Sequence, residues 1–547
     1  MRSITRRITN KAFTILTGSS VLLLTLVLLI VLGPMVWRGA KAVVFEETIE
    51  FRKMQLDLYH RGDPKKLEAE ITETEDFRKQ VYNTIVDFKH GIDTEELIDK
   101  SKQIYRQFGN ELRFKGIEGE KYREIRSRAK EIRDRLREAF ESDDKEKIKQ
   151  DIDYVLQFRS NEDFVDTAAA DFFTLAEDFL KSIENIDLKK RQQYAESLRQ
   201  IEDILFGSTQ RPGLLGPRPT EPVPVLTMLR YGATRWDQVQ KLMDQFLWSE
   251  QWVQKEAGQP LVKVRNSRKA EFAGTKLEPL FEYVENNLDD MLKPKFRFYW
   301  QYFIDDSTPG HYFGGVGPEI FGTLLLTLLA MLFVFPLGVI SAAYLVECAP
   351  DNFAISIIRM CINTLAGVPS IVFGLFGLAF FVLFFIPLFG GPSKDCILAA
   401  SLTLAVLTLP VMIRASEEAI RSVPQTYKEA SLGLGASRFR TFVKVTFPAA
   451  LPGILTGVIL SLSRVAGETA PILFTGAVAL GPTPKSLFDQ TRTLSYGSYD
   501  IAVGDKLAMM VPHNQYGMVV TLVLLILCLN AIAIYMRAKI FRKLKGN

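Results

Sequence analysis

Residues 12–37 read AFTILTGSSVLLLTLVLLIVLGPMVW, with no charged side chain over 26 positions. A helix of this length spans the hydrocarbon core of a bilayer, which takes about 20 residues. The small residues Ala40 and Ala42 that follow resemble a signal-peptide cleavage site. The apolar core of a signal peptide, however, extends to only about 15 residues. We therefore expect a retained first transmembrane helix and exclude a wholly soluble protein.

The rest of the 547-residue chain divides by charge into two contrasting parts. Residues 38–318 hold 98 of the 130 charged side chains, whereas residues 319–536 hold 23. The first part has the composition of a soluble domain and the second that of a membrane bundle. All four cysteines lie in the second part and the four histidines are scattered. We therefore expect neither a disulfide framework in the first part nor a metal site.

The basic residues predict how the chain is oriented. The first eleven residues carry a charge of +4 and residues 537–547 carry +5. Since lysine and arginine are enriched on the cytoplasmic side of membrane proteins, both termini are expected in the cytoplasm. The further apolar segments occupy about 319–346, 362–388, 397–415, 453–480 and 515–536. In the second of these, the sequence GVPS at 367–370 should break the helix, so 354–366 is expected to lie flat or to form a separate short helix. Tracing the chain through these segments places its longest inner loop, residues 416–452, on the same side as both termini.

The expected fold is therefore an all-α polytopic membrane protein with six transmembrane helices. A large, mainly helical extracytoplasmic insertion would separate the first helix from the second. Its helices are indicated by apolar stripes such as Ile132, Leu136 and Phe140. The expected parts are a basic cytoplasmic N-terminus (1–11), transmembrane helix 1 (12–37), the extracytoplasmic domain (38–318), a five-helix core (319–536) and a basic cytoplasmic tail (537–547).

Residues 416–452 contain a patterned segment that could dock a partner. Glu429, Ala430 and Ser431 are followed by Gly435 and, thirteen residues later, by Pro448. Small residues permit close contact with another protein, and a glycine permits the chain to turn out of a helix. We expect a short helix at about 425–437 that seats in a groove of a partner. The alternative is an ordinary amphipathic loop.

A second candidate site lies inside the fifth apolar segment. Arg464 and Glu468 are four residues apart, and Thr469 follows them. Ionisable residues are costly within a membrane and usually face a transport pathway or a partner. Arg464, Glu468 and Thr469 are therefore our candidates for a translocation path or its gate. A purely structural ion pair is the alternative.

These segments together resemble a known family. Glu429-Ala430-Ser431, Gly435, Val445 and Phe447-Pro448 resemble the EAA motif of ABC importer membrane subunits, with mild departures at Ser431, Val445 and Phe447. The stretch from Arg464 to Pro471 and the earlier GVPSIVFGL at 367–375 resemble the permease subunits of phosphate ABC importers, the PstA type in particular. The resemblance covers about residues 310–545 and does not clearly cover 43–300.

The resemblance implies a permease subunit that translocates inorganic phosphate across the bacterial cytoplasmic (inner) membrane. The resemblance implies three protein partners: a second, PstC-like permease subunit, two copies of a PstB-like ATPase and an extracytoplasmic PstS-like phosphate-binding protein. This chain would also contact membrane lipid. The EAA segment would dock the ATPase. ATP and Mg²⁺ would be bound by that ATPase, with no cofactor in this chain.

The chain itself has no G-x-x-x-x-G-K-[ST] loop for ATP, so we do not expect an enzyme. The basic tails favour juxtamembrane anchoring over nucleic acid binding. Another oxyanion, namely sulfate, molybdate or phosphonate, is the alternative substrate, because fold does not determine substrate. An extracytoplasmic sensor is a further alternative, although a sensor would continue into a soluble signalling module rather than into four more membrane segments.

Overall fold

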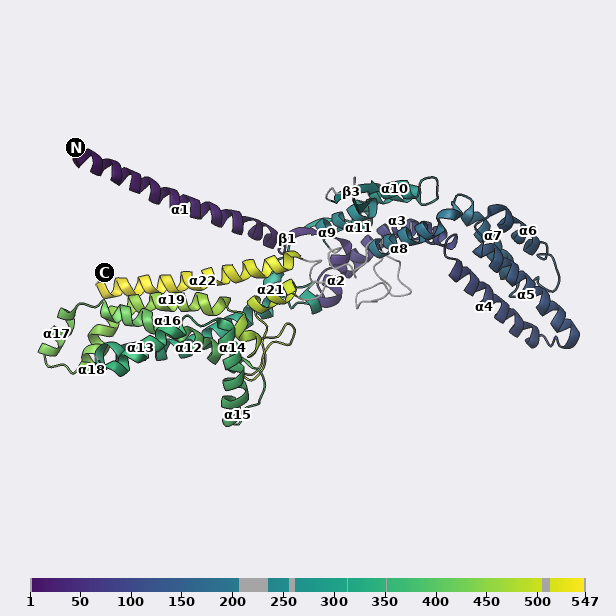
Figure 1. Ribbon diagram of the computed structural model, residues 1–547. Coiled ribbons are helices and arrows are strands. Elements are labelled where there is room, and N and C mark those ends of the chain that lie inside the picture. The colour runs from purple at the N-terminus through teal and green to yellow at the C-terminus, as the bar shows by residue number, and fades with distance from the viewer. Residues whose placement is uncertain are drawn as a thin grey trace. The chain divides into compact units, whose positions relative to one another are not determined.

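The computed structural model describes residues 2–205, 235–254, 261–311, 313–350, 352–503 and 512–545 (Figure 1). The last two residues of the expected cytoplasmic tail, 546–547, lie outside these ranges. The chain forms two compact units: Met1–Phe45 together with Arg297–Asn547, and Glu46–Phe296. The chain passes between them within strands β1 (Val44–Glu47) and β4 (Lys295–Phe298), which pair with each other.

The first unit is a helical membrane bundle. Its described residues form six helices long and apolar enough to cross a membrane: Lys11–Ala40, Gly317–Cys348, Ser370–Leu388, Ile397–Arg421, Arg438–Gly467 and His513–Lys543. The prediction of an all-α protein with six membrane spans is thus confirmed. The long helices are α1 (Arg2–Ala40), α12 (Gly317–Ala343), α16 (Ile397–Arg421), α19 (Phe447–Gly467) and α22 (Pro512–Lys545). The shorter helices are α13 (Phe353–Leu365), α14 (Ser370–Gly377), α15 (Ile386–Leu388), α17 (Gln425–Gly433), α18 (Arg438–Thr441), α20 (Ala470–Leu473) and α21 (Leu494–Val503).

One predicted break is confirmed, and one predicted segment has different bounds in the structure. The break expected at 367–370 is present: α13 ends at Leu365 and α14 begins at Ser370, directly after Pro369, so the residues before the break form a separate short helix. The segment expected at 453–480 ends as a helix at Gly467. Glu468 is extended there (φ −74°, ψ 134°), and Pro471 lies in the first turn of α20. Apolar composition continues past this break, which is why hydropathy alone overestimates the length of the helix.

Small residues let the long helices approach closely. A Cβ atom added at Gly453 would lie 2.7 Å from the Cβ of Ala419, and one added at Gly457 would lie 2.7 Å from that of Ala415. These contacts join α19 to α16. Membrane helices associate largely through such close packing, since lipid supplies no hydrophobic drive between them. The spacing of small residues therefore fixes α19 against α16 and sets the position of every side chain that α19 carries.

An exposed apolar segment lies next to the first turn of α12. Backbone hydrogen bonds from Val316 N to Tyr302 O (2.7 Å) and from Gly317 N to Asp305 O (3.1 Å) hold the preceding chain there. In this segment Trp300 is 52% exposed and Ile304 is 62% exposed. Tryptophan is enriched at the membrane–water interface, where its ring is partly apolar and its N–H meets water. The segment therefore fits the lipid headgroup region.

This position predicts that lipid quenches the fluorescence of Trp300. In a variant whose other four tryptophans are phenylalanine, lipid brominated near the headgroup should quench Trp300. A matched variant that keeps only Trp37, which is 73% exposed on α1, provides the positive control. Quenching of Trp37 without quenching of Trp300 would contradict the interfacial position.

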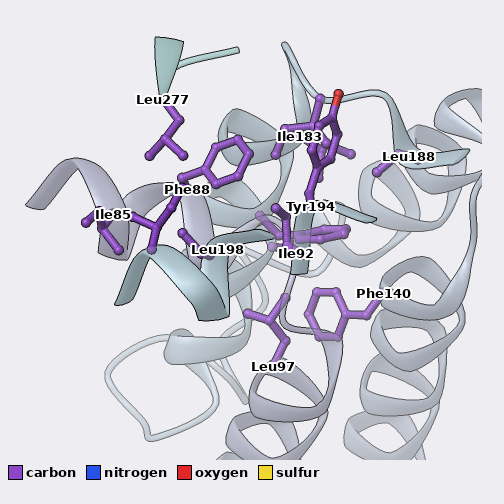
Figure 2. Close-up of a cluster of buried hydrophobic side chains, with 14 of the residues drawn as sticks. Ile85, Phe88, Ile92, Leu97, Phe140, Ile183, Leu188, Tyr194, Leu198 and Leu277 are labelled. Atoms are coloured by element: carbon purple, nitrogen blue, oxygen red, sulfur yellow. The ribbon is translucent and has the colours of Figure 1, made fainter. Parts of the chain in front are cut away.

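The second unit is also mainly helical. Its helices are α2 (Ile49–Tyr59), α3 (Pro64–His90), α4 (Thr94–Phe114), α5 (Gly119–Glu141), α6 (Lys145–Leu156), α7 (Ala170–Ile183), α8 (Arg191–Leu205), α9 (Trp236–Leu247), α10 (Arg268–Glu271) and α11 (Glu278–Leu292). Strands β2 (Trp248–Val253) and β3 (Val262–Ser267) form an antiparallel pair. The predicted stripe of Ile132, Leu136 and Phe140 is buried, as expected. One hydrophobic core runs through the unit, and Figure 2 shows Phe88, Tyr194 and Phe140 among its side chains.

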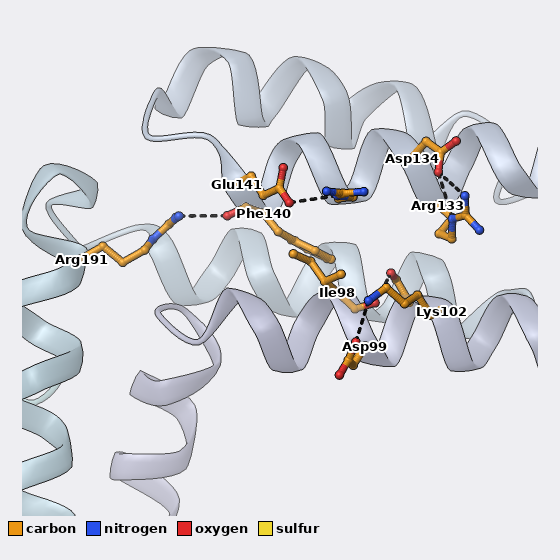
Figure 3. Close-up of polar contacts among 10 residues, drawn as sticks. Ile98, Asp99, Lys102, Arg133, Asp134, Phe140, Glu141 and Arg191 are labelled. Carbon is orange, nitrogen blue, oxygen red and sulfur yellow. Dashed lines mark hydrogen bonds and ion pairs between the residues drawn. The ribbon is translucent and has the colours of Figure 1, made fainter.

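Polar side chains form hydrogen bonds and ion pairs at the ends and on the surfaces of these helices (Figure 3). Arg191 Nη1 donates to the carbonyl oxygen of Phe140 at 2.9 Å, near the C-terminus of α5. Carbonyls in a last helical turn lack partners within the helix, so a guanidinium satisfies one of them. Lys102 and Asp99 form an exposed pair at 2.8 Å. Such exposed pairs contribute at most about 1 kcal/mol, so the buried core accounts for most of the stability.

Candidate functional site

The predicted docking segment folds as the short helix α17, followed by a sharp turn at Gly435. Gly435 has φ 83°, a conformation that side chains with a Cβ rarely adopt. Its amide donates to Leu432 O at 2.9 Å, and the amide of Ala436 donates to Ser431 O at 3.2 Å. This pair of bonds is the Schellman arrangement that ends a helix at a left-handed residue. Gly435 thus turns the chain out of α17, as its sequence position indicated.

The surface of this segment is suited to a partner. Glu429 and Ala430 are exposed, and Ser431 is partly buried, with its hydroxyl 2.9 Å from the hydroxyl of Thr441. Large apolar side chains are also exposed along the segment: Tyr427 (57%), Leu432 (42%), Leu434 (91%) and Phe439 (77%). Exposed large apolar side chains that gather in one segment are typical of a protein interaction site. These side chains are therefore available for contact with a partner.

The predicted path residues lie at the far end of α19. Arg464 Nε is 3.5 Å from Glu468 Oε1, although the helix ends at Gly467 between them. The Arg464 side chain is 34% exposed and that of Glu468 is 19% exposed. Within the described part of the chain, Arg464 Nε has no hydrogen-bond acceptor. The guanidinium is therefore balanced by a nearby carboxylate, while its buried Nε makes no hydrogen bond within the described residues.

The backbone around Glu468 is held by the first turn of α21. Ser495 Oγ donates to the carbonyl oxygen of Glu468 at 3.1 Å. Thr469, the third predicted residue, precedes α20 and is partly buried. Pro448 lies in the first turn of α19, sixteen residues before Arg464. At ~1.5 Å per residue the two candidate sites are about 24 Å apart along this helix. The structure does not bring the docking segment and the path residues together, but one rigid element joins them.

A charged cluster that the sequence reasoning missed lies beside the N-terminus of α12. Arg492 is 3% exposed, and its Nη1 lies 2.7 Å from Asp306 Oδ1 and 3.5 Å from Glu319 Oε1. Ser307 Oγ donates to Glu319 Oε1 at 3.2 Å. Burial and the positive Arg492 lower the pKa of His311 to about 4. His311 is therefore neutral at pH 7, and Arg492 is balanced by the two carboxylates.

A second missed contact tethers the docking helix. Lys428 Nζ donates to Glu347 Oε1 at 2.6 Å, across 81 positions of sequence. Neither residue is part of the docking pattern. Glu347 is a single charge at the end of an apolar run, but Lys428 lies beside Glu429 in a polar stretch. The sequence therefore holds no signal that identifies the pair.

A family match covers most of the bundle. The family described as "Binding-protein-dependent transport system inner membrane component" matches residues 334–546, which include α17 and Arg464. The "Probable ABC transporter permease protein YqgI" of Bacillus subtilis (strain 168) is 36% identical over 249 residues. That alignment covers 43% of this chain and 81% of the Bacillus protein.

Several relatives, including the following two, have names that specify phosphate. The "Probable phosphate transport system permease protein PstA" of Methanocaldococcus jannaschii is 34% identical over 209 residues, covering 36% of this chain and 72% of its own length. The "Phosphate transport system permease protein PstA" of Mycobacterium leprae (strain TN) is 39% identical over 175 residues, or 32% of this chain. The chain spans 55% of the length of the M. leprae protein.

Proposed function

This chain belongs to the PstA-like permeases of the ABC importer family, and we propose that it translocates inorganic phosphate across the cytoplasmic membrane. One observation carries the choice of phosphate: relatives named as phosphate permeases are 34–39% identical over a segment that this chain shares with them. The partly exposed guanidinium of Arg464 supports the choice, because arginine binds phosphate oxygens through directional N–H donors.

The proposed assembly follows from the family and from the exposed surfaces. A PstC-like permease subunit would complete the membrane path, and two PstB-like ATPases would bind ATP and Mg²⁺. A PstS-like protein would deliver phosphate from outside, in keeping with the family description "Binding-protein-dependent". The exposed apolar side chains of α17 support docking of an ATPase at that helix. The basic residues of 1–11 and 537–547 favour a cytoplasmic position for both termini.

The proposed mechanism uses α19 as the link between docking and transport. Closure of the ATPases on nucleotide would move α17, and the turn at Gly435 would pass this movement into α18 and α19. Arg464, near the other end of α19, would meet the anion or open its path. Glu468 would keep the guanidinium oriented, and it lowers the cost of holding a positive charge inside a membrane.

Replacing Gly435 tests the docking role. Gly435→Ala should weaken association with the ATPase about tenfold, since a Cβ at this left-handed position costs roughly 1–2 kcal/mol. No atom lies within 4 Å of the added Cβ, so the cost is conformational and not steric. Gly433→Ala is the matched control, because Gly433 also has open space but has no positive φ. The measurement is co-purification of the ATPase, and equal recovery with both variants would contradict the role of the turn.

Uptake in cells tests the substrate. In cells that depend on this importer, labelled phosphate should accumulate, and unlabelled sulfate, molybdate or phosphonate in tenfold excess should compete poorly. If one of these anions competes strongly, that anion would take the place of phosphate as the proposed substrate. No uptake of any of the four anions would refute the proposed class of substrate.

A further inference from the structure

The last turn of the α12 span accepts hydrogen bonds from two other helices. This turn, Tyr344–Cys348, has π-helical geometry. Its Glu347 carboxylate accepts a hydrogen bond from Lys428 Nζ of α17, and its Leu345 carbonyl accepts one from Arg359 Nη2 of α13 at 2.8 Å. π-Helical turns are uncommon and occur frequently at functional sites. Two cations from separate helices are therefore fixed on one short, irregular turn.

The burial of Lys428 shows how closely α17 is tied to this turn. Of the nine residues of α17, all of them described, only Lys428 is buried. Its side chain is 11% exposed and that of Glu347 is 27% exposed. Lysine is rarely buried unless it is paired, because its ammonium group is strongly hydrated in water. The Lys428–Glu347 pair is thus a close, partly desolvated contact and differs from the exposed pairs on the surface.

Another contact of α17 connects it to α18. Ser431 contacts Thr441 of α18, from which the chain continues into α19. Arg359, which binds the π-helical turn, also lies 3.5 Å from Glu417 of α16. A movement of α17 therefore has two routes into the bundle. One route passes through Gly435, Thr441 and the chain itself to α19, and the other passes through Lys428 and Glu347 to α12.

We propose that Lys428 and Glu347 are positioning residues that couple ATP hydrolysis to transport by making α12 move with α17. This inference rests on the proposed role of α17 as the ATPase-docking helix. The ion pair transmits displacement because α17 has no other buried side chain to hold it against the bundle. Without the pair, the ATPases still dock and hydrolyse ATP, but α12 no longer follows. The second route through α19 then works alone, and each hydrolysed ATP moves less phosphate.

The test uses the complete importer in proteoliposomes with the phosphate-binding protein present. The variants are Lys428→Gln, Glu347→Gln and the charge exchange Lys428→Glu with Glu347→Lys. Three quantities are measured: bound ATPase, the rate of ATP hydrolysis, and phosphate transported per ATP. Each single variant should keep the first two and lower the third about tenfold, which is ~1.4 kcal/mol of coupling. The charge exchange should restore phosphate per ATP to within about threefold of the parent, as expected for a direct pair.

Arg421→Gln is the matched control. Arg421 Nη2 lies 2.9 Å from Glu417 Oε1 in the last turn of α16, and the Arg421 side chain is 53% exposed. An ion pair with a solvent-exposed partner contributes little. This variant should leave phosphate per ATP unchanged.

Two results would overturn the inference: single variants with normal phosphate per ATP, or a charge exchange as uncoupled as the single variants. Loss of bound ATPase in the single variants would also overturn it, because the pair would then support docking instead of transmission. A parent complex that binds no ATPase, or transports no phosphate, would refute the proposed function and is distinguished by the parent measurement.

Discussion

Replacing Arg464 with glutamine is expected to lower phosphate uptake at least about tenfold, while membrane insertion and association with the ATPase persist. Glutamine keeps hydrogen-bonding groups but removes the charge. A hydrogen bond to a charged group contributes about 1.5–3 kcal/mol, equivalent to ~10- to 150-fold in a rate or an affinity. The side chain is 34% exposed, so its replacement leaves no sealed cavity. The measurement is labelled phosphate uptake, normalised to the amount of assembled complex.

The double replacement of Arg464 and Glu468 by glutamine separates a path role from a structural role. If the pair only holds the bundle together, removing both charges should restore assembly and uptake, since no unpaired charge remains. If Arg464 meets the anion or gates its path, the double variant should assemble and stay inactive. Arg537→Gln is a control, because Arg537 of α22 is another arginine that contacts α19: its Nη1 donates to Thr456 Oγ1 at 3.0 Å. Normal uptake by the double variant would rule out the path assignment.

Replacing Arg492 with glutamine is expected to destabilise the membrane unit by about 3–5 kcal/mol, because it leaves a buried carboxylate without its counter-charge. Glu319 is 0% exposed and lies 3.5 Å from Arg492 Nη1. The measurement is the temperature at which the purified complex loses its monodisperse elution peak after heating.

Two further variants define the cause of this loss. Asp306→Asn removes the other partner of Arg492, but the Asp306 side chain is 62% exposed, so the loss should stay below about 1 kcal/mol. Arg492→Gln with Glu319→Gln removes both buried charges and should recover most of the stability. Equal melting temperatures for Arg492→Gln and Asp306→Asn would show that Glu319 does not depend on Arg492.

Short-range patterns predicted well those features that depend on short-range physics. Apolar runs identified the six membrane spans, because a bilayer demands length and low charge in each span separately. Gly435 was expected to permit a turn, and it has the positive φ that such a turn requires. The end of α19 was placed thirteen residues too late, because hydropathy does not register the backbone break at Glu468 and Pro471.

Contacts between distant residues could not be predicted in this way. Lys428 and Glu347 are 81 residues apart, and Arg492 lies 173 residues after Glu319. No periodicity connects such residues, and only the packing of α12 against its neighbours brings them together. Arg464 and Glu468 were found because four residues make one helical turn. Their pairing at 3.5 Å persists although the helix stops between them.

We propose that this chain forms the membrane path of a phosphate importer driven by ATP. This proposal is tested by ATP hydrolysis of the reconstituted complex, with its binding protein, in the presence of one anion at a time. Phosphate should stimulate hydrolysis and be transported in proportion to it, whereas sulfate, molybdate and phosphonate should have little effect. Stimulation and transport by another of these anions, with phosphate inert, would contradict it.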